Sequence, residues 1–180
     1  MAFLKKKWNF GLHLSFSFED KPMGTAGGVK EAQGLLGKKD FLALYGDNLC
    51  DFDIRKLCAF HRTQKAIATI GVFDSSKTKH TGILAGLVRV GPHGKVEKFI
   101  EKRNNQKVEN GFVNAGIAVF SPRIFSRIPA GRHYDFGKNV YPGLLRQSRR
   151  LVAVEGATYV LASDTAETLK RTRRLAAKVL

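Results

Sequence analysis

The segment GTAGG, from Gly24 to Gly28, has a composition suited to phosphate binding. Glycines let a backbone approach a ligand closely, and the helix predicted to follow offers unpaired amides and the positive end of its dipole. Such a turn can hold a nucleotide. The structural alternative is the glycine-rich start of a helix with Thr25 as its N-cap.

An aspartate follows directly on a short, continuously apolar run. The run from Phe41 to Tyr45 is typical of a strand buried on both faces of a parallel sheet, and Gly46 and Asp47 end it. Ligands of open α/β sheets bind beyond the carboxyl ends of strands. Magnesium takes one or two protein carboxylates and completes its shell with water and phosphate oxygens, so Asp47 is well placed to hold it. The alternative is a turn or helix-cap residue ahead of Asp53.

Three further polar residues stand where apolar strands end or are interrupted. Glu101 and Lys102 follow a predicted strand, and the pair could accept from sugar hydroxyls and bind a phosphate. An exposed pair at a strand end is the alternative. Asn114 lies inside an apolar strand, where its amide needs partners, and these could be sugar hydroxyls or backbone groups.

Taken in order, four segments resemble the motifs of the sugar-phosphate nucleotidyltransferases, the NDP-sugar pyrophosphorylases that include mannose-1-phosphate guanylyltransferases. They are GTAGG, LYGDN (Leu44 to Asn48), FIEK (Phe99 to Lys102) and VNAGIAVF (Val113 to Phe120), and the similarity covers about residues 10–169. The family transfers a nucleoside monophosphate from a nucleoside triphosphate to a sugar 1-phosphate, giving an NDP-sugar and pyrophosphate. The resemblance implies these two substrates as partners, and Mg²⁺ as the cofactor.

The resemblance also implies a role for each matching residue. Asp47 would bind the metal and, with Lys102, take part in catalysis. Lys102 would also hold the sugar phosphate, while Gly82, Glu101 and Asn114 would contact the sugar. The residues expected to contact the nucleotide are Gly24, Thr25, Ala26 and Gly27.

Two departures from the family pattern bear on activity. The family opens with a G-x-G-T-R loop that binds the triphosphate, and none precedes Gly24, so we expect an N-terminally truncated member. Ala162 stands where the family has a second metal-binding aspartate, and Asp164 is either a substitute metal ligand or a helix cap. Because preorganised donors supply much of the rate of phosphoryl transfer, the chain alone could be inactive. The alternative function is a catalytically inactive sugar-nucleotide-binding or regulatory remnant.

The elements that must position these residues follow from the apolar pattern. Strands alternating with helices predict one α/β domain over residues 1–180, a three-layer α/β/α sandwich with a mostly parallel, Rossmann-like sheet. Glycines and Pro92 between Thr81 and Lys98 predict a small β-arm beside that sheet, and Asp135 is expected to cap a helix. Strands are expected at 12–18, 41–45, 67–73, 96–100, 112–120, 151–154 and 158–161, and helices at 26–36, 53–62, 136–147 and 165–179.

Composition narrows the choice of partners. The net charge of +16 favours anions, but the basic residues form separate clusters without an RNA- or DNA-reading motif, so nucleic-acid binding is the least favoured function. No apolar run approaches the ~20 residues that span a bilayer, and no secretory pattern opens the sequence, so we expect a cytoplasmic protein without a membrane partner. Cys50 and Cys58 are expected to be free thiols. The absent first strand would leave a sheet edge unpaired, which predicts a homo-oligomer or a separate N-terminal fragment as partner.

Overall fold

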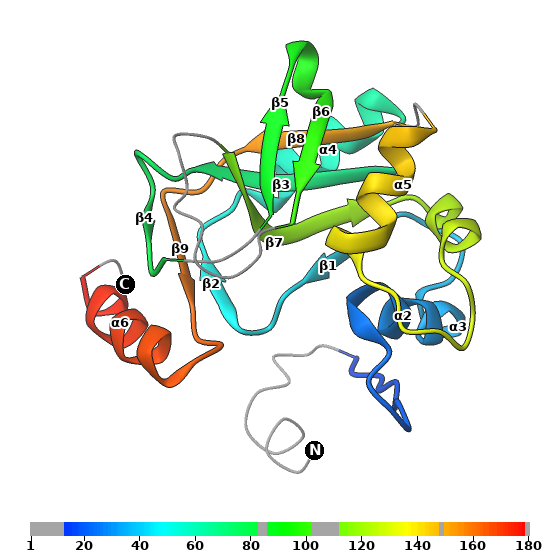
Figure 1. Ribbon diagram of the computed structural model, residues 1–180, viewed down its shortest axis with the longest axis horizontal. Helices are drawn as coiled ribbons and strands as arrows, with labels where there is room; N and C mark the ends of the chain where they lie inside the picture. The colour runs from blue at the N-terminus through cyan, green and yellow to red at the C-terminus, as the bar shows by residue number, and fades with distance from the viewer. Residues whose placement is uncertain (1–12, 83–85, 102–111, 148–149, 179–180) are drawn as a thin grey trace.

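The computed structural model describes residues 13–82, 86–101, 112–147 and 150–178. At its centre is a six-stranded sheet (Figure 1). Its strands follow the order β6-β5-β7-β3-β8, and β1 pairs with β7 beside this path. The strands are β1 Phe41–Leu44, β3 Ala68–Asp74, β5 Leu87–Val90, β6 Val96–Ile100, β7 Phe112–Phe120 and β8 Leu151–Glu155. A smaller sheet has the order β2-β9-β4, formed by β2 Asn48–Cys50, β9 Tyr159–Ala162 and β4 Lys79–His80.

Strand β7 organises the large sheet because two strands share one of its edges. β1 pairs antiparallel with Ile117 to Phe120, whereas β5 pairs antiparallel with Phe112 and Val113. β1 therefore ends, and β5 begins, on either side of residues 114–116. The segment after β1 and the segment before β5 meet at this point, which is where the candidate site lies.

Apolar side chains divide between the two faces of the sheet and make two clusters. In β7, for example, Phe120 faces one cluster and Val119 the other. The first cluster is covered by α2 (Gly24–Glu31), α3 (Gln33–Leu36), the 3-10 helix η2 (Pro122–Arg127), the π-helical turn η3 (Phe136–Val140) and α5 (Tyr141–Arg146). The second is enclosed by α4 (Ile54–Gln64) and the small sheet, and α6 (Ala166–Ala176) lies beside β9 (Figure 1). The expected three layers are confirmed.

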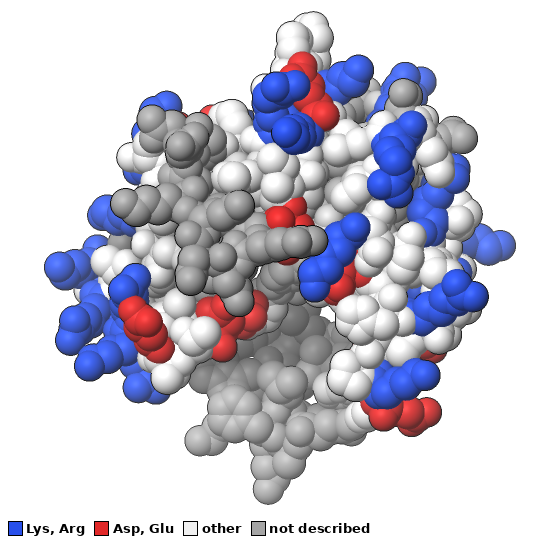
Figure 2. All heavy atoms as spheres, viewed as in Figure 1, with Lys and Arg blue, Asp and Glu red and all other residues white. Residues whose placement is uncertain are grey.

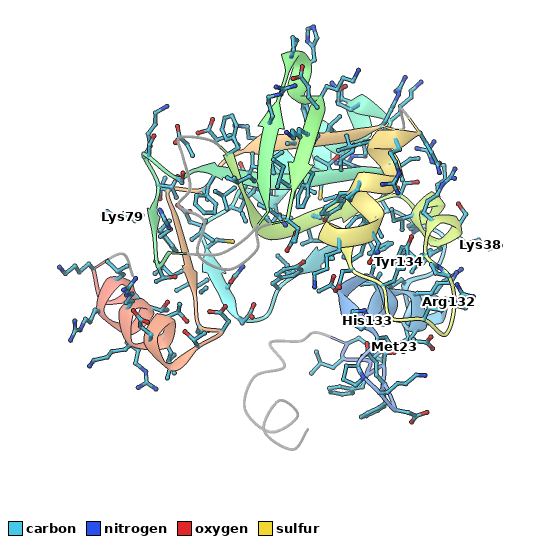
Figure 3. The ribbon with its side chains drawn as sticks, in the orientation of Figure 1. Met23, Lys38, Lys79, Arg132, His133 and Tyr134 are labelled. Carbon is cyan, nitrogen blue, oxygen red and sulfur yellow. The ribbon has the colours of Figure 1, made fainter. Side chains whose placement is uncertain are left out.

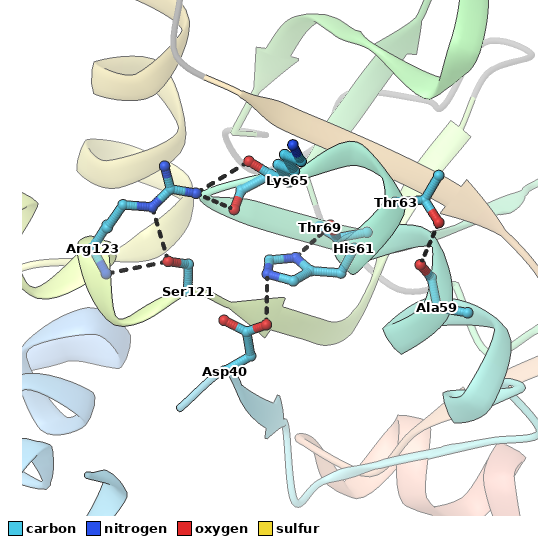
Figure 4. A network of polar contacts seen from close by, with 9 residues as sticks. Asp40, Ala59, His61, Thr63, Lys65, Thr69, Ser121 and Arg123 are labelled. Atoms are coloured by element: carbon cyan, nitrogen blue, oxygen red, sulfur yellow. Dashed lines mark hydrogen bonds and ion pairs between the residues drawn. The ribbon is translucent and has the colours of Figure 1, made fainter. Parts of the chain in front are cut away.

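A polar network ties α4 to the sheet (Figure 4). The buried His61 ring contacts Thr69 Oγ1 through Nδ1 at 2.7 Å, and its Nε2 lies 3.9 Å from Asp40 Oδ2. Lys65 ends α4 in the left-handed conformation, with φ of 46°. Arg123 Nη2 donates to the carbonyl oxygens of Lys65 and Ala66 at 3.1 and 3.0 Å, which satisfies acceptors at the end of the helix.

Several predicted elements are confirmed with small shifts of their ends. Strands β3, β6, β7 and β8 and helices α4 and α6 occupy the expected places, and both cysteines are free thiols. The predicted arm returns through the 3-10 turn η1 (Pro92–Gly94). It is part of the main sheet and does not lie beside that sheet, because β5 pairs with β7. Residues 159–162 form a separate strand of the small sheet.

Other predictions are wrong. The alternating segment 12–18 forms no strand over its described residues, and Phe18 is 71% exposed, because none of the described strands lies beside it to bury one face. The large sheet is mainly antiparallel, since β3–β8 is its one parallel pairing among the described strands. β1 is half-buried and antiparallel to β7, so its short apolar run did not indicate burial on both faces. No helix in the described part of the chain is both long and apolar enough to cross a membrane.

Candidate active site

A cleft of about 250 Å³ opens where β1 and β5 diverge along β7. Acidic side chains gather around the hollow near the middle of the face in Figure 2. Four carboxylates line it, and they belong to Asp47, Glu101, Asp135 and Asp164. The remaining lining residues are Thr25, Tyr45, Asn48, Gly86, Asn114, Gly116, Gly137, Lys138 and Ala162. The structure therefore brings together residues from seven separate segments of the sequence.

A bulge in β7 places Asn114 at the floor of this cleft. The register between β3 and β7 shifts between Ile70 and Val72, and Gly116 has φ of 75° there. Bulges of this kind redirect side chains and are frequent next to active sites. Asn114 is buried, and its Oδ1 accepts from the Gly116 amide at 3.2 Å. The side-chain nitrogen of Asn114 has no acceptor among the described residues. The Gly116 amide therefore satisfies the side-chain oxygen, and the side-chain NH₂ group can donate to a ligand.

The pairing of β2 with β9 brings the segments of Asp47 and Asp164 to the same cleft. Asn48 lies opposite Ala162 in this pairing. At the next residue pair the Asp47 carbonyl accepts hydrogen bonds from the Ser163 amide at 2.8 Å and from the Ser163 hydroxyl at 2.9 Å. Both aspartates line the cleft, and the described ranges contain no group of three or more His, Cys, Asp or Glu residues close enough to hold a metal ion by themselves. Two carboxylates with phosphate oxygens and water match what Mg²⁺ requires, so the donor set fits that ion.

Asp164 is not the cap of helix α6. Thr165 occupies the N-cap position and forms a capping box with Thr168. Asp164 instead accepts a hydrogen bond from the Thr168 hydroxyl at 2.8 Å, which orients its carboxylate.

Glu101, Asp135 and Lys138 lie close together in the lining of the cleft. Gly137 packs directly against the Glu101 carboxylate, and a side chain at this position would collide with it. Burial raises the pKa of Glu101, while Lys138 lowers that pKa and Asp135 raises it. Lys138 Nζ lies 3.7 Å from Asp135 Oδ2. Lys138 is the one basic residue among the described cleft-lining residues.

The glycine-rich segment starts helix α2, but its amides are already bonded within the protein. Ala26 and Gly27 both donate to the Tyr134 carbonyl at 2.9 Å, and Thr25 donates to Asp135 Oδ1 at 3.2 Å. A Cβ on Gly24 would lie 2.7 Å from the same carbonyl. The glycines thus let α2 pack against residues 132–135, beside which Met23 lies in Figure 3. The expectation of unpaired amides is wrong for Thr25, Ala26 and Gly27. Of the four residues expected to contact the nucleotide, Gly24 to Gly27, Thr25 alone lines the cleft.

One expected capping role is wrong, because Met23, not Thr25, is the N-cap of α2. Asp135 occupies the N-cap position of η3 as expected, but its side chain makes no capping hydrogen bond and accepts from Thr25 instead. The hydroxyl of Thr25 in turn accepts from the Phe136 amide at 3.0 Å.

Two predicted sugar-phosphate residues are not placed in the cleft. Lys102 lies outside the described residues. Gly82 follows β4, takes φ of 86° and donates to His80 Nδ1 at 3.1 Å, away from the cleft lining. Gly86 lines the cleft instead, and its carbonyl accepts a hydrogen bond from the backbone N–H of Asn114 at 3.0 Å. Its place directly before β5 was a signal that sequence analysis could have used.

Tyr45, Asn48 and Gly116 were missed as cleft residues although two of them flank Asp47. Tyr45 ends β1, where its amide donates to the Gly116 carbonyl at 2.9 Å. Burial raises the pKa of the Tyr45 phenol, and Glu101, Asp135 and Asp47 raise it further. Asn48 Nδ2 donates to the Ala115 carbonyl at 3.4 Å. The neighbourhood of Asp47 in LYGDN was the available signal for both.

Carboxylates and an amide at strand ends around one cleft are typical of α/β proteins that act on phosphorylated substrates. Residues 2–160 match the family described as nucleotidyl transferase, and the chain belongs to that family. It is 31% identical over 166 residues to a UTP--glucose-1-phosphate uridylyltransferase of Synechocystis, covering 85% of this chain and 42% of the relative. It is 30% identical over 135 residues to a mannose-1-phosphate guanylyltransferase of Mycobacterium tuberculosis, covering 75% of this chain and 36% of the relative.

Solved structures share the fold. HddC from Yersinia pseudotuberculosis superposes with a TM-score of 0.76 at 19% identity, over 97% of this chain and 72% of HddC. The α/β fold and the resemblance to sugar-phosphate nucleotidyltransferases are thus confirmed. The chain spans only 42% and 36% of the lengths of the two curated relatives.

Proposed function

We propose that the cleft serves nucleotide-sugar biosynthesis by joining a nucleoside triphosphate to a sugar 1-phosphate. An oxygen of the sugar phosphate attacks the α-phosphorus, a new P–O bond forms, and the bond to pyrophosphate breaks. The products are an NDP-sugar and pyrophosphate. The observation that carries the proposal is the convergence of Asp47, Glu101 and Asn114 in one cleft of a nucleotidyl transferase family member.

The lining residues divide the two substrates between them in this proposal. Asn114 and Glu101 both line the cleft, as does Gly86, and they would bind sugar hydroxyls through the side-chain amide and the carboxylate. The glycines at positions 86 and 137 accommodate protein side chains, because a Cβ on Gly86 would collide with the Phe99 ring and a Cβ on Gly137 with the Glu101 carboxylate. Lys138 would bind a phosphate on the same wall. Orientation of this kind supplies a large part of the rate of phosphoryl-type transfer.

Asp47 and Asp164 would hold Mg²⁺ at the other wall. When bound, the ion would neutralise charge on the phosphates. The chain's own contribution is to fix the two carboxylates: the β2–β9 pairing fixes the Asp47 backbone, and Thr168 fixes the Asp164 side chain. Ala162 lies between them in the lining and contributes no ligand.

Binding of both substrates would need more positive charge than the described lining of the cleft supplies. A triphosphate and a sugar phosphate bring several negative charges, whereas the described lining has four carboxylates and one lysine. Lys102, a second copy of the chain or another polypeptide could supply the missing positive charge. The second edge of β1 has no partner among the described strands and is one place where such a segment could pair.

The test is magnesium-dependent pyrophosphate release by the purified chain, with a panel of nucleoside triphosphates and sugar 1-phosphates. Asp47→Ala should abolish release, and Asp20→Ala, which removes an exposed carboxylate away from the cleft, should not. No release from folded protein with any pair would contradict catalysis by this chain alone. Binding of sugar 1-phosphates and nucleotides would then show whether an inactive binding remnant is left.

A further inference from the structure

A second cavity of about 240 Å³ lies on the other side of the π-helical turn η3. The turn separates it from the cleft, because Gly137 and Lys138 line the cleft while Asn139 and Val140 line the second cavity. The other lining residues come from η2, α5 and the residues next to them, and they are Ser126, Arg127, Tyr134, Gly143, Leu144, Arg146 and Gln147.

The polar lining of this cavity consists largely of hydrogen-bond donors. It contains two guanidinium groups, from Arg127 and Arg146, and no carboxylate among the residues that line it. Asn139 Oδ1 accepts from the Asp135 amide at 2.8 Å, and Gln147 Oε1 accepts from Arg127 Nη1 at 3.0 Å. Both side-chain amides therefore have their acceptor oxygens occupied and their NH₂ groups left over. This is the opposite of the cleft, which four carboxylates line.

No ion pair neutralises either guanidinium group within the part of the chain that the structure describes. Among these residues the Arg127 side chain donates a hydrogen bond to Gln147, and its Nε is buried with no partner. Buried donors almost always have a partner, and an orphaned one calls for an explanation. Arg146 is exposed and forms no ion pair with the residues that the structure describes.

We propose that this cavity binds a phosphate group of a small molecule. Two guanidinium groups match the charge of a phosphate dianion, and each can donate two parallel hydrogen bonds to it. The volume lies below the roughly 300–1,000 Å³ of sites that enclose whole drug-sized ligands, so the cavity takes the phosphate and leaves the rest of the molecule outside. The site does not depend on the proposed reaction in the cleft.

The test uses inorganic phosphate as the probe and two-dimensional ¹H–¹⁵N NMR of the full chain, including arginine Nε–H signals. Sodium phosphate is compared with sodium chloride at equal ionic strength. We expect saturable shifts in residues 126–127 and 139–147 with phosphate alone. Arg146→Met, at an exposed position where substitutions usually change stability little, should weaken binding about tenfold, as expected for loss of hydrogen bonds from a charged donor. Arg55→Met, an exposed arginine on α4, should change it less than about twofold.

Three outcomes would overturn the site. Chloride could reproduce the shifts, which would show a nonspecific response to salt. Arg146→Met and Arg55→Met could weaken binding equally, which would show general attraction to a basic protein. Lys138→Met could abolish binding while Arg146→Met retains it, which would place the phosphate in the cleft. Arg127→Lys provides an independent check, since it keeps the charge and removes the orphaned Nε, and it should also weaken binding.

Discussion

Replacement of Thr25 by valine tests whether the glycine-rich segment is a structural contact or a ligand-binding turn. Valine has nearly the same shape but lacks the hydroxyl. In the structure that hydroxyl accepts from the Phe136 amide at 3.0 Å and donates to Asp135 Oδ1 at 3.4 Å. The first bond ties α2 to η3 and is partly buried, whereas the second is long and exposed.

The expected cost follows from these two bonds. Thr25→Val leaves the Phe136 amide without an acceptor, and an unsatisfied buried donor costs ~1–3 kcal/mol. The 3.4 Å contact adds little, because hydrogen bonds weaken at that length. The folded-to-unfolded ratio should therefore fall by about 5- to 150-fold. With a urea m-value of ~2 kcal/mol/M, the unfolding midpoint should drop by about 0.5–1.5 M.

Urea unfolding followed by circular dichroism measures this change, and Thr25→Ser is the matched control. Serine keeps the hydroxyl and loses one methyl group from an exposed position, so its midpoint should stay close to that of the original chain. Equal midpoints for the valine and serine variants would refute the structural role. If nucleotide affinity alone then fell in the valine variant, Thr25 would be a ligand-binding residue as first expected from the sequence.

Three further substitutions test the bulge and the buried histidine. Gly131→Ala, at φ of 67° with open space around it, should cost ~1–2 kcal/mol for the left-handed backbone alone. Gly116→Ala adds a Cβ 2.5 Å from Asn48 Nδ2, so it should lower the free energy of unfolding in urea by ~1–3 kcal/mol more than Gly131→Ala does. Equal losses in the two variants would show that the bulge tolerates a side chain. For His61, burial holds the pKa below its ordinary value of 6.5, while Asp40 opposes this shift. The unfolded chain then binds more protons than the folded one as pH falls below 6.5, so the free energy of unfolding should decrease over that range. His61→Gln should flatten this pH dependence, and an unchanged slope would assign it to other groups.

The sequence allowed much of the local structure to be predicted but less of the pairing. Helix α4 and strands β3, β6 and β7 were foreseen because their apolar periodicity is long enough to identify them. The segment 12–18 has equally regular alternation and forms no strand over its described part. Alternation shows which residues could share a buried face, but a strand also needs a neighbour to supply hydrogen bonds. That neighbour is a long-range property that no local pattern contains.

The candidate site was predicted in part. Asp47, Glu101, Asn114 and Asp164 line one cleft, as the resemblance implied for residues acting on the same substrates. Ala26 and Gly27 bond to the Tyr134 carbonyl instead of facing the cleft. A glycine-rich helix start has the same sequence whether its amides meet a ligand or a backbone carbonyl from more than 100 residues away. Lys138 was missed because its place in the cleft depends on how η3 packs, whereas the position of Gly86 before β5 was a signal available in the sequence.

The amino-acid sequence by itself determined the family, the α/β class and the residues whose chemistry suits phosphates and sugars, since these depend on residue type and short-range order. Tertiary structure alone decided that β1 and β5 share one edge of β7 and that the bulge at Gly116 turns Asn114 into the space between them. It also decided that η3 separates an acidic cleft from a cavity lined by arginines. These features arise from contacts between residues distant in the chain, whose free energy depends on how the whole sheet and its helices pack.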